Sequence, residues 1–313
     1  MCPGRPSRPG VNPMRTKDAI RSYAHSLNID LIGFTDASPL SAEAVRFQTW
    51  LDAGMNGGMH WLNRRPAARY NPVELLEDAR TVICAAVSYY SGHPGTSCVA
   101  RYAYGKDYHQ VLNDKLAQIL AFLRQADPGL MAKICVDTSP LAEKSLAGKA
   151  GLGWQGRNTL LINECYGSWI CLGELIINRA YEPDHPAPPR CGACRACIDA
   201  CPTGALRDDG SLDAGRCLSY ISAYDDQETA DLRGTILGCD ICQNVCPFNL
   251  HPLAGREKAL LEPNPLTARA IRELSSLDRE AYETARNDTA FSRLPFRRFQ
   301  LNLIRSGLKH PPT

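Results

Sequence analysis

Apolar positions along the first half of the chain follow two different periods, and each period predicts a different kind of element. After Thr16, a favourable helix cap, apolar residues recur at helical spacing over 19–27 and predict a first helix. Segments 29–37 and 81–90 are rich in β-branched and aromatic residues, which is typical of strands. Segment 107–125 returns to helical spacing, with its leucines, isoleucine and valine on one face. The pattern therefore predicts helices packed on a sheet.

The next stretch continues this mixture. Ser41 is expected to open a second helix, and residues 132–137 (AKICVD) form an apolar strand. Pro140 stands where a further helix would begin. Segments 159–163 and 168–178 are expected to be adjacent strands, paired as a hairpin through the turn between them. The fold class indicated is α+β, with a largely antiparallel sheet.

A polar, proline-rich segment, YEPDHPAPPR, marks a boundary near residue 182. Before Met14, a plausible true start, the chain is expected to be a disordered tail without the apolar core of a secretory signal. The expected divisions are the tail at 1–13, a catalytic domain at 14–181, a cysteine-rich module at 182–250 and a helical C-terminal region at 251–313.

Composition changes this picture at one point only. The chain has 313 residues, 44% apolar and 22% charged, and a net charge of +2, which selects no class of partner. No stretch is long and apolar enough to predict a membrane span. The 14 cysteines are unusual, however, and in a chain without a secretory signal they favour metal binding over disulfides.

Eight of these cysteines lie between Cys191 and Cys246, in two related runs. The first run is a complete C-x2-C-x2-C-x3-C-P motif, and the second has the same form without its first cysteine, for which Cys217 is the candidate. In two-cluster ferredoxins the last cysteine of each run ligates the other cluster. The predicted ligands are Cys191, Cys194, Cys197 and Cys246 for one [4Fe–4S] cluster, and Cys201, Cys217, Cys239 and Cys242 for the other.

Structural zinc is the alternative for such thiolates, but zinc sites do not require this doubled C-x2-C-x2-C-x3-C-P spacing. The remaining cysteines have an ordinary explanation, since Cys84, Cys135 and Cys171 lie in apolar strands and are expected to pack as small hydrophobic residues. Electron transfer by two iron–sulfur clusters is therefore the predicted chemistry of the module.

Two further motifs do not support the chemistry they suggest. Residues 151–156 (GLGWQG) match the dinucleotide fingerprint, but a helix is expected before them and a strand after them, which is the reverse of the required order. Asp107 and His109 match the start of a D-x-H-x-x-G corrinoid signature, but Leu112 stands where the glycine belongs. Neither nucleotide binding nor histidine ligation of cobalt is expected.

Three segments together resemble the epoxyqueuosine reductases, cobalamin-dependent iron–sulfur enzymes of queuosine synthesis in tRNA. They are 100–109 (ARYAYGKDYH), 136–163 (VDTSPLAEKSLAGKAGLGWQGRNTLLIN) and 201–206 (CPTGAL), and the resemblance extends over about 16–308. More distantly, the chain is similar to reductive dehalogenases. The resemblance implies an N-terminal corrinoid-binding α/β sandwich, a ferredoxin-like module with two [4Fe–4S] clusters, and a helical C-terminal tail.

The implied reaction is reduction of epoxyqueuosine to queuosine at the anticodon wobble position, with electrons passing from the clusters to cobalamin that has no protein ligand beneath cobalt. Asp137 matches the family's proton donor. It ends an apolar strand, where burial is expected to raise the pKa of a carboxyl group, although an aspartate that merely starts a turn is the ordinary alternative. The corrinoid contacts implied by matched position are Arg69, Ala100, Asp137, Lys144, Asn158, Leu161, Asp240 and Ile241.

The segment from Thr289 onward is basic, has no acidic residue and interleaves Phe291, Phe296 and Phe299 with its cations. Such a stretch suits phosphate contacts and base stacking, or equally an amphipathic surface helix; the resemblance favours tRNA. The expected tRNA contacts are Arg293, Arg297, Arg298, Arg305 and Lys309.

The expected protein is a cytoplasmic monomer, not attached to a membrane, that takes electrons from an external low-potential donor. Many members of the family continue into a C-terminal helical-repeat extension, whereas this sequence ends at Thr313, so the surface for tRNA is expected to be smaller. The alternatives are a corrinoid-dependent reductase acting on a small molecule, as in the dehalogenases, and a plain two-cluster electron carrier.

Overall fold

The computed structural model describes residues 16–92, 98–226 and 229–308, and is built around one four-stranded antiparallel sheet. The strand order is β1-β2-β6-β3, so the two eight-residue strands occupy the centre and the shorter ones the edges. Each residue of β2 is buried, since helices cover both faces of the sheet. The strands of this sheet are β1 (Leu31–Asp36), β2 (Thr81–Ser88), β3 (Ala132–Cys135) and β6 (Ile170–Ile177).

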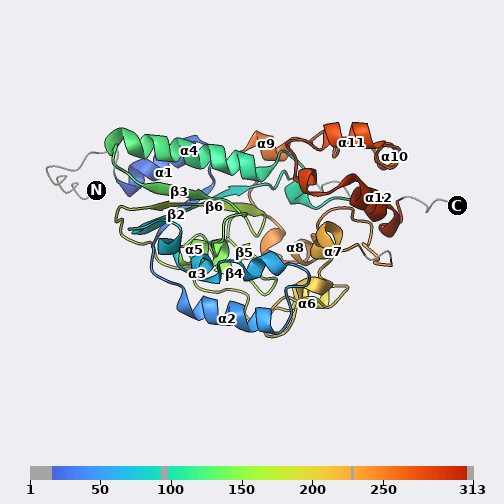
Figure 1. Ribbon diagram of the computed structural model, residues 1–313, viewed down its shortest axis with the longest axis horizontal. Helices are drawn as coiled ribbons and strands as arrows, with labels where there is room; N and C mark the ends of the chain where they lie inside the picture. Colours follow the sequence, from blue (N-terminus) through green and yellow to red (C-terminus); the bar gives the residue numbers. More distant parts are fainter. Residues whose placement is uncertain (1–15, 93–97, 227–228, 309–313) are drawn as a thin grey trace.

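Helices α1 (Lys17–Ser26) and α4 (Tyr108–Ala126) lie on one face of the sheet (Figure 1). Their apolar sides meet alternate strand residues such as Phe34 and Ile83 in one core. The opposite face carries a second core, in which strand residues contact the short helix α5 (Glu143–Lys149). Beyond α5 lie α2 (Ser41–Asp52), α3 (Pro66–Tyr70) and the small β4–β5 ribbon (Trp154–Gln155, Leu161–Ile162).

The cysteine-rich module and the C-terminal helices lie at the other end of the molecule (Figure 1). A third core joins the loop around Val99 and Ala103 to C-terminal residues such as Tyr282 and Phe299. The C-terminal helices are therefore integral to the fold. These parts contain α6 (Ala196–Asp199), α7 (Leu218–Tyr224), α8 (Ile241–Asn244), α9 (Lys258–Leu261), α10 (Ile271–Ser275), α11 (Arg279–Ala285) and α12 (Phe296–Arg305).

Most of the predicted elements are present, and Thr16 caps α1 as expected by accepting a hydrogen bond from the Ala19 N–H. The predicted hairpin of 159–163 with 168–178 is wrong. Residues 161–162 pair with 154–155 instead, and only an isolated bridge between Asn163 and Gly167 connects toward β6. Since β6 already has β2 and β3 on its two sides, no edge is left for a hairpin partner. The predicted tail at 1–13, and Met14, lie outside the described residues.

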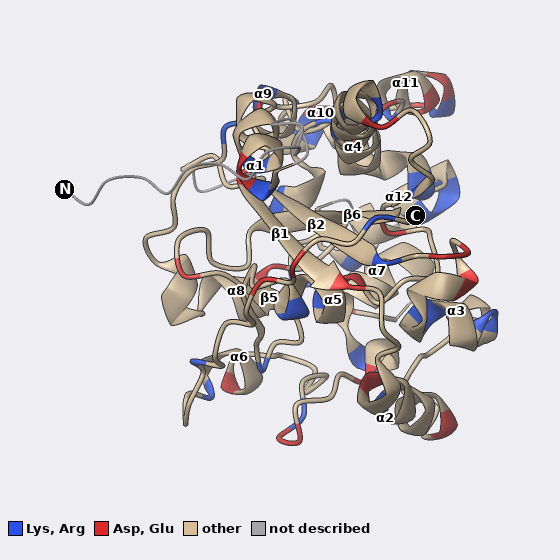
Figure 2. Cartoon of the chain, turned by 90° about the vertical axis from the view of Figure 1, so that its left-hand side faces the viewer, with Lys and Arg blue, Asp and Glu red and all other residues tan. Residues whose placement is uncertain are grey.

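No helix in the described part of the chain is long and apolar enough to cross a membrane. Basic and acidic residues are interspersed over the face shown in Figure 2, rather than separated into regions of one sign. Recognition of a charged partner must therefore come from local groups of side chains.

The sheet and α5 approach each other most closely at Gly33. A Cβ atom on Gly33 would lie 2.1 Å from the carbonyl oxygen of Ala150 and 2.5 Å from Leu152 Cδ1. Ala150 follows directly after α5, so this contact fixes the distance between β1 and that helix. Only glycine is compatible with it, because a backbone oxygen cannot move aside as a flexible side chain would.

We expect Gly33→Ala to destabilise the protein by about 2 kcal/mol or more, because the added methyl group overlaps backbone atoms. Gly129→Ala is the matched control: the atoms nearest to its added Cβ are 3.7 Å away, and a change within about 0.5 kcal/mol is expected. Anaerobic urea denaturation of the two variants and the wild type measures the difference. Equal midpoints for Gly33→Ala and wild type would contradict this packing.

Candidate active site and cluster sites

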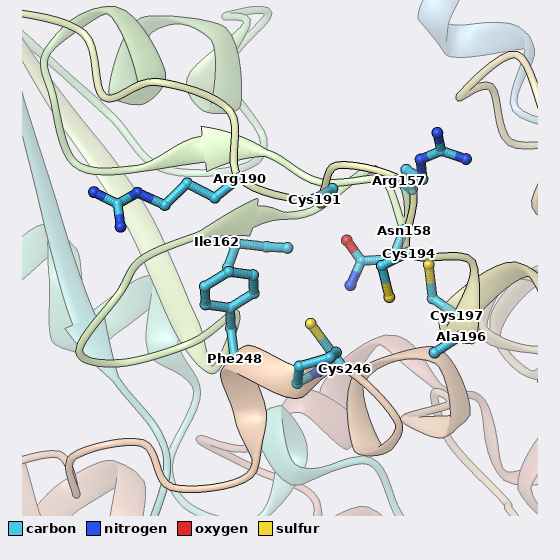
Figure 3. Close-up of a pocket in the computed structure, with 11 residues that line it drawn as sticks. Arg157, Asn158, Ile162, Arg190, Cys191, Cys194, Ala196, Cys197, Cys246 and Phe248 are labelled. Carbon is cyan, nitrogen blue, oxygen red and sulfur yellow. The ribbon is translucent and has the colours of Figure 1, made fainter.

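One cavity of about 230 Å³ is lined by cysteines from both runs. Cys191, Cys194 and Cys197 come from the first run, and Cys246 comes from the end of the second (Figure 3). Ile162 and Phe248 form an apolar wall beside them. The structure thus brings together the four cysteines that the crossed-run pattern groups around one cluster.

The other four predicted ligands also approach one another. Burial, together with the neighbouring thiols of Cys217 and Cys201, raises the pKa of the Cys239 thiol to about 11. Burial likewise raises the pKa of Cys242, with Cys239 and Cys217 adding to the effect. Thiols that are buried together and disfavour each other's ionisation are typical of a site that becomes stable once a cationic centre is bound.

The spacing of these cysteines suits a cluster better than a single ion. Within the described residues, no three His, Cys, Asp or Glu side chains lie close enough together to hold one metal ion. A structural zinc ion needs its sulfur ligands about 2.3 Å from the metal, so the sulfur atoms must almost touch. A cubane holds its thiolates at separate corners, which suits four cysteines that line a cavity of about 230 Å³.

Asn158 projects into the first cavity. Its side chain is buried, its Oδ1 accepts a hydrogen bond from the Leu160 N–H at 3.3 Å, and its Nδ2 has no partner among the described residues. Figure 3 shows the amide pointing into the space between the cysteines. The family resemblance assigns Asn158 to the corrinoid contacts, whereas in the structure Asn158 lies beside the first set of cysteines. An unpaired N–H there suits a hydrogen bond to cluster or cysteine sulfur.

A second cavity, of about 310 Å³, lies where the sheet domain, the module and the C-terminal region meet. Tyr102, Tyr108 and His109 line it from one side, Cys217 from the module, and Arg293 from the C-terminal region. Because Cys217 is a predicted cluster ligand, the second cluster site borders the same space as these polar side chains.

Beside this cavity Asp137 belongs to a hydrogen-bonded group of four side chains, of which His109 and Arg293 line the cavity. Its Oδ2 lies 3.0 Å from His109 Nε2 and accepts a hydrogen bond from Arg293 Nη1 at 2.9 Å. The other ring nitrogen of His109, Nδ1, lies 2.5 Å from Asp107 Oδ1. The Asp137 backbone is in the left-handed region, with φ of 51°, which an aspartate tolerates better than most residues.

The pKa of Asp137 corrects the expectation from sequence. Desolvation does act to raise this pKa, but hydrogen bonds from His109 and Arg293, together with their charges, outweigh it and lower the pKa to about 2. Desolvation lowers the pKa of His109, and its bonds to Asp107 and Asp137 more than reverse that effect, so its pKa is raised. In the resting site the negative charge therefore belongs to the aspartate, and the two carboxylates beside His109 favour the protonated form of its ring.

His109 is the residue of this site that sequence reasoning missed. The Asp107–His109 pair was visible as a motif, but only cobalt ligation was considered for it, and both ring nitrogens are already engaged by carboxylates. Arg293 was expected to contact tRNA, and the structure places its guanidinium against Asp137 and His109.

The remaining predicted corrinoid contacts form two groups. Arg69, Lys144 and Leu161 gather around α5: the Ala142 N–H donates to the Arg69 carbonyl at 2.8 Å, and Lys144 Nζ donates to the Thr159 carbonyl at 2.7 Å. Leu161 is buried in the core below that helix, so only its backbone is available to a ligand.

The second group lies beside the module. The Ala100 N–H donates to the carbonyl of Leu237, and the carboxylate of Asp240 accepts a hydrogen bond from the Arg101 N–H at 2.8 Å. Ile241 follows Asp240 as the first residue of α8.

In the first group, Arg69 Nε is buried and has no partner among the described residues. This group therefore has a hydrogen-bond donor that a ligand could satisfy.

The predicted tRNA contacts in the C-terminal region differ in exposure. Arg297 is exposed, whereas Arg298 is occupied by Asp226 and by the Ala223 carbonyl. The prediction for Arg305 is wrong, because its side chain is buried and donates to the Asp225 carbonyl. Lys309 lies outside the described residues.

The aromatic residues of this region do not form a stacking surface. Phe291 and Phe299 are completely buried in the third core, and Phe296 packs against it. The amphipathic-helix alternative therefore explains the interleaved phenylalanines, because one face of α12 completes the core.

Comparison with known proteins identifies the family of this chain. Residues 190–249 match the family described as 4Fe-4S double cluster binding domain, and residues 69–138 match epoxyqueuosine reductase QueG, DUF1730. An epoxyqueuosine reductase of Cyclobacterium marinum is 33% identical over 295 residues, which cover 91% of this chain and 94% of the relative. The chain belongs to the epoxyqueuosine reductase family. Its module therefore binds two [4Fe–4S] clusters.

Solved structures agree with this assignment. A crystal structure of epoxyqueuosine reductase with a tRNA-Tyr epoxyqueuosine-modified tRNA stem loop is 30% identical, covers 93% of this chain and 80% of its own, and superposes with a TM-score of 0.84. A Bacillus subtilis epoxyqueuosine reductase, solved with the catalytic loop that carries an aspartate swung out of the active site, is 29% identical with the same coverage and TM-score. A reductive dehalogenase, 16% identical with a TM-score of 0.50, shares the fold.

Asn158 provides a test of the first cluster site in this epoxyqueuosine reductase family member. We expect Asn158→Leu to lower the reduction potential of one cluster by about 40 mV, because loss of one hydrogen bond to sulfur, about 1 kcal/mol, destabilises the reduced form. Anaerobic redox titration followed by electron paramagnetic resonance measures it. Asn178→Leu, at a site outside the cysteine cavities, is the control and should leave both potentials unchanged. Unchanged potentials in Asn158→Leu would remove Asn158 from the cluster site.

Proposed function

We propose that this protein reduces epoxyqueuosine to queuosine at the wobble position of tRNA, with Asp137 as the proton donor. The observation that carries the proposal is the family relationship over nearly the whole chain, together with the contacts of Asp137 with His109 and Arg293, which line the cavity bordered by Cys217. The relative solved with an epoxyqueuosine-modified tRNA stem loop supports the choice of substrate.

Removal of the epoxide oxygen as water requires two electrons and two protons, and leaves a carbon–carbon double bond. The oxygen leaves poorly as an alkoxide, so a proton delivered to it lowers the barrier. Asp137 Oδ2 is the atom proposed to deliver that proton. Because the pKa of Asp137 is low in the resting site, its proton must come from a neighbour, and His109, whose ring lies between Asp107 and Asp137 and whose pKa is raised, is the candidate to supply it. His109 and Asp137 would thus act together.

Cobalamin is the implied cofactor, and the polar atoms of the predicted contacts, above all the buried and unpaired Arg69 Nε, are compatible with it. When bound, cobalamin supplies a reducible cobalt ion that takes single electrons and passes them on as a pair. Both nitrogens of His109 are engaged, so the imidazole that lines the cavity is not free to bind cobalt, in agreement with a corrinoid that has no protein ligand. We propose that Arg69, with its unpaired Nε, and Lys144 contact the polar rim of the corrinoid, and that Ala100, Asp240 and Ile241 contact it from the module side.

Lys144 is suited to such a contact. Its side chain is open to solvent, yet desolvation by the surrounding protein lowers its pKa. A lysine that is accessible but surrounded lies in a concave surface, where an amide or phosphate group of a ligand can replace water around the ammonium group.

The remaining partners follow from this reaction. We propose that an external low-potential donor reduces the clusters, and that the protein acts as a monomer in the cytoplasm. The first cluster site is the more accessible of the two to a donor, because Cys194 is exposed to solvent. Arg297 is a basic residue of the C-terminal region whose side chain is exposed on α12, and we propose it as a phosphate contact.

We expect Asp137→Asn to lower the rate of queuosine formation at least about 100-fold, because an amide cannot supply the proton. The assay is anaerobic single-turnover conversion of tRNA that carries epoxyqueuosine, by protein loaded with clusters and cobalamin. Asp114→Asn, an exposed site on α4, should leave the rate unchanged. Wild-type rates in Asp137→Asn, with iron and cobalamin contents equal to those of wild type, would rule out Asp137 as the proton donor.

We expect Arg297→Ala to weaken tRNA binding about three- to tenfold at low salt, and to reduce the salt dependence of binding by about one phosphate contact. Fluorescence anisotropy of a labelled anticodon stem loop at several salt concentrations measures both quantities. Arg46→Ala is the control, since its side chain is exposed on α2 and paired with Glu43. Equal affinities for the two variants would argue against a role for Arg297.

A further inference from the structure

Glu174 is a carboxyl group in the middle of the central sheet. It is completely buried in β6, directly across from Cys84 on β2 and from Cys135 on β3. Neither of its oxygens meets the geometry of an ordinary hydrogen bond within the described residues. Burial of an unpaired carboxylate is very unfavourable, so this group must hold a proton.

The carboxyl group facing Glu174 is Glu143, in the first turn of α5. Burial raises the pKa of Glu174 well above its ordinary value, and the charge of Glu143 raises it further. The pair therefore carries one proton on Glu174 and one negative charge on Glu143. Glu143 then uses that charge at its other side, where its Oε1 accepts a hydrogen bond from the Asp137 backbone N–H at 2.5 Å.

This last bond holds the turn that presents Asp137. The backbone of Asp137 is left-handed, and the Thr138 N–H donates to the Val136 carbonyl at 2.5 Å, so the chain reverses sharply here. Residues 137–140 belong to no helix or strand. A charged acceptor for the N–H at the centre of such a turn stabilises it more than a neutral one does.

We propose that Glu143 and Glu174 form a one-proton latch, in which the proton on Glu174 keeps Glu143 ionised so that Glu143 can hold the Asp137 turn in its working position. Glu143 is a positioning residue in this proposal, and Glu174 acts through it. The inference rests on the proposed role of Asp137 in the reaction.

The latch depends on pH in a definite direction. Desolvation raises the pKa of Glu143 to about 7, while the hydrogen bond from the Asp137 N–H lowers it and the nearby Asp137 charge raises it. The turn can open while α5 stays packed on the sheet, so burial of Glu143 by the sheet is the same in both states, and only the bond and the Asp137 charge differ. Because the bond outweighs the charge, closure of the latch favours the ionised form. The latch is therefore strongest above about pH 7 and weakens as the pH falls through that value. The other titratable groups that face the pair are Asp137, His109, Arg69, Lys144, Tyr108, Cys84, Cys135 and Cys171.

Hydrogen exchange of the peptide over 133–141 tests the latch without any turnover. The protein, loaded with clusters and cobalamin, is compared about one unit above and about one unit below pH 7, with the intrinsic pH effect on exchange removed. In the wild type we expect protection of the Asp137 turn to fall at least about threefold on the acid side. Glu77→Gln, an exposed site in a turn, is the matched control and should behave as wild type.

The two variants of the pair should differ from each other. Glu143→Gln keeps a neutral acceptor only, so protection should be reduced and equal at the two pH values. Glu174→Gln replaces a protonated carboxyl group with an amide that is likewise neutral, so it should retain wild-type protection and pH dependence. Unchanged protection in Glu143→Gln would overturn the latch, and loss of protection in Glu174→Gln would overturn the assignment of the proton.

The rate of queuosine formation separates this inference from the proposed function. If the exchange pattern appears and the wild type converts tRNA, the Glu143→Gln rate should fall about tenfold and lose the step near pH 7. If the exchange pattern appears without any conversion by the wild type, the latch stands and the proposed reaction fails. If the wild type converts tRNA while exchange is the same in all variants, the reaction stands and the latch fails.

Discussion

The shared hydrogen bonds of Asp137 are the interaction on which the arrangement of this site depends. The aspartate follows β3, His109 lies in the first turn of α4, and Arg293 belongs to the C-terminal region. These three segments are far apart in sequence, and each belongs to a different core or covers a different side of the sheet. A carboxylate between an imidazole and a guanidinium group stabilises their approach, and it also fixes one wall of the second cavity.

The central sheet positions the residues that support the Asp137 site. Its central strand β6 carries Glu174 toward the face covered by α5, and Gly33 on β1 allows the end of α5 to approach within backbone contact. Together these features place Glu143 at the start of α5, next to the Asp137 turn. Burial of a carboxyl group in a sheet is energetically unfavourable. The presence of Glu174 at this position is explained by its effect on Glu143.

The sequence predicted the parts of the fold that depend on local pattern. Thr16 and the apolar repeat after it predict α1, and the two cysteine runs predict which thiols gather around the first cavity, because such spacing has few other uses. Pairing of the strand at 161–162 was missed, because a short apolar segment gives no sign of which neighbour it will join.

The roles of the charged residues were harder to predict from the sequence than those of the cysteines. Arg305 and Arg297 look alike in the sequence, yet one is buried against a backbone carbonyl and the other is exposed, since only the packing of α12 decides which face each occupies. The pKa of Asp137 was expected to be high from burial alone. Its partners come from 28 residues before it and 156 after it, which no local pattern could indicate.

The position of Cys246 has a consequence for the synthesis of the protein. The cavity that holds three cysteines of the first run is completed by a residue about fifty positions later, so it cannot close while the intervening chain is still inside the ribosome. Insertion of the first cluster must therefore wait until the whole module has emerged. The crossed arrangement thus makes the full ligand set of the first cluster depend on the last cysteine of the module, and a chain that stops before Cys246 lacks one of the four thiolates.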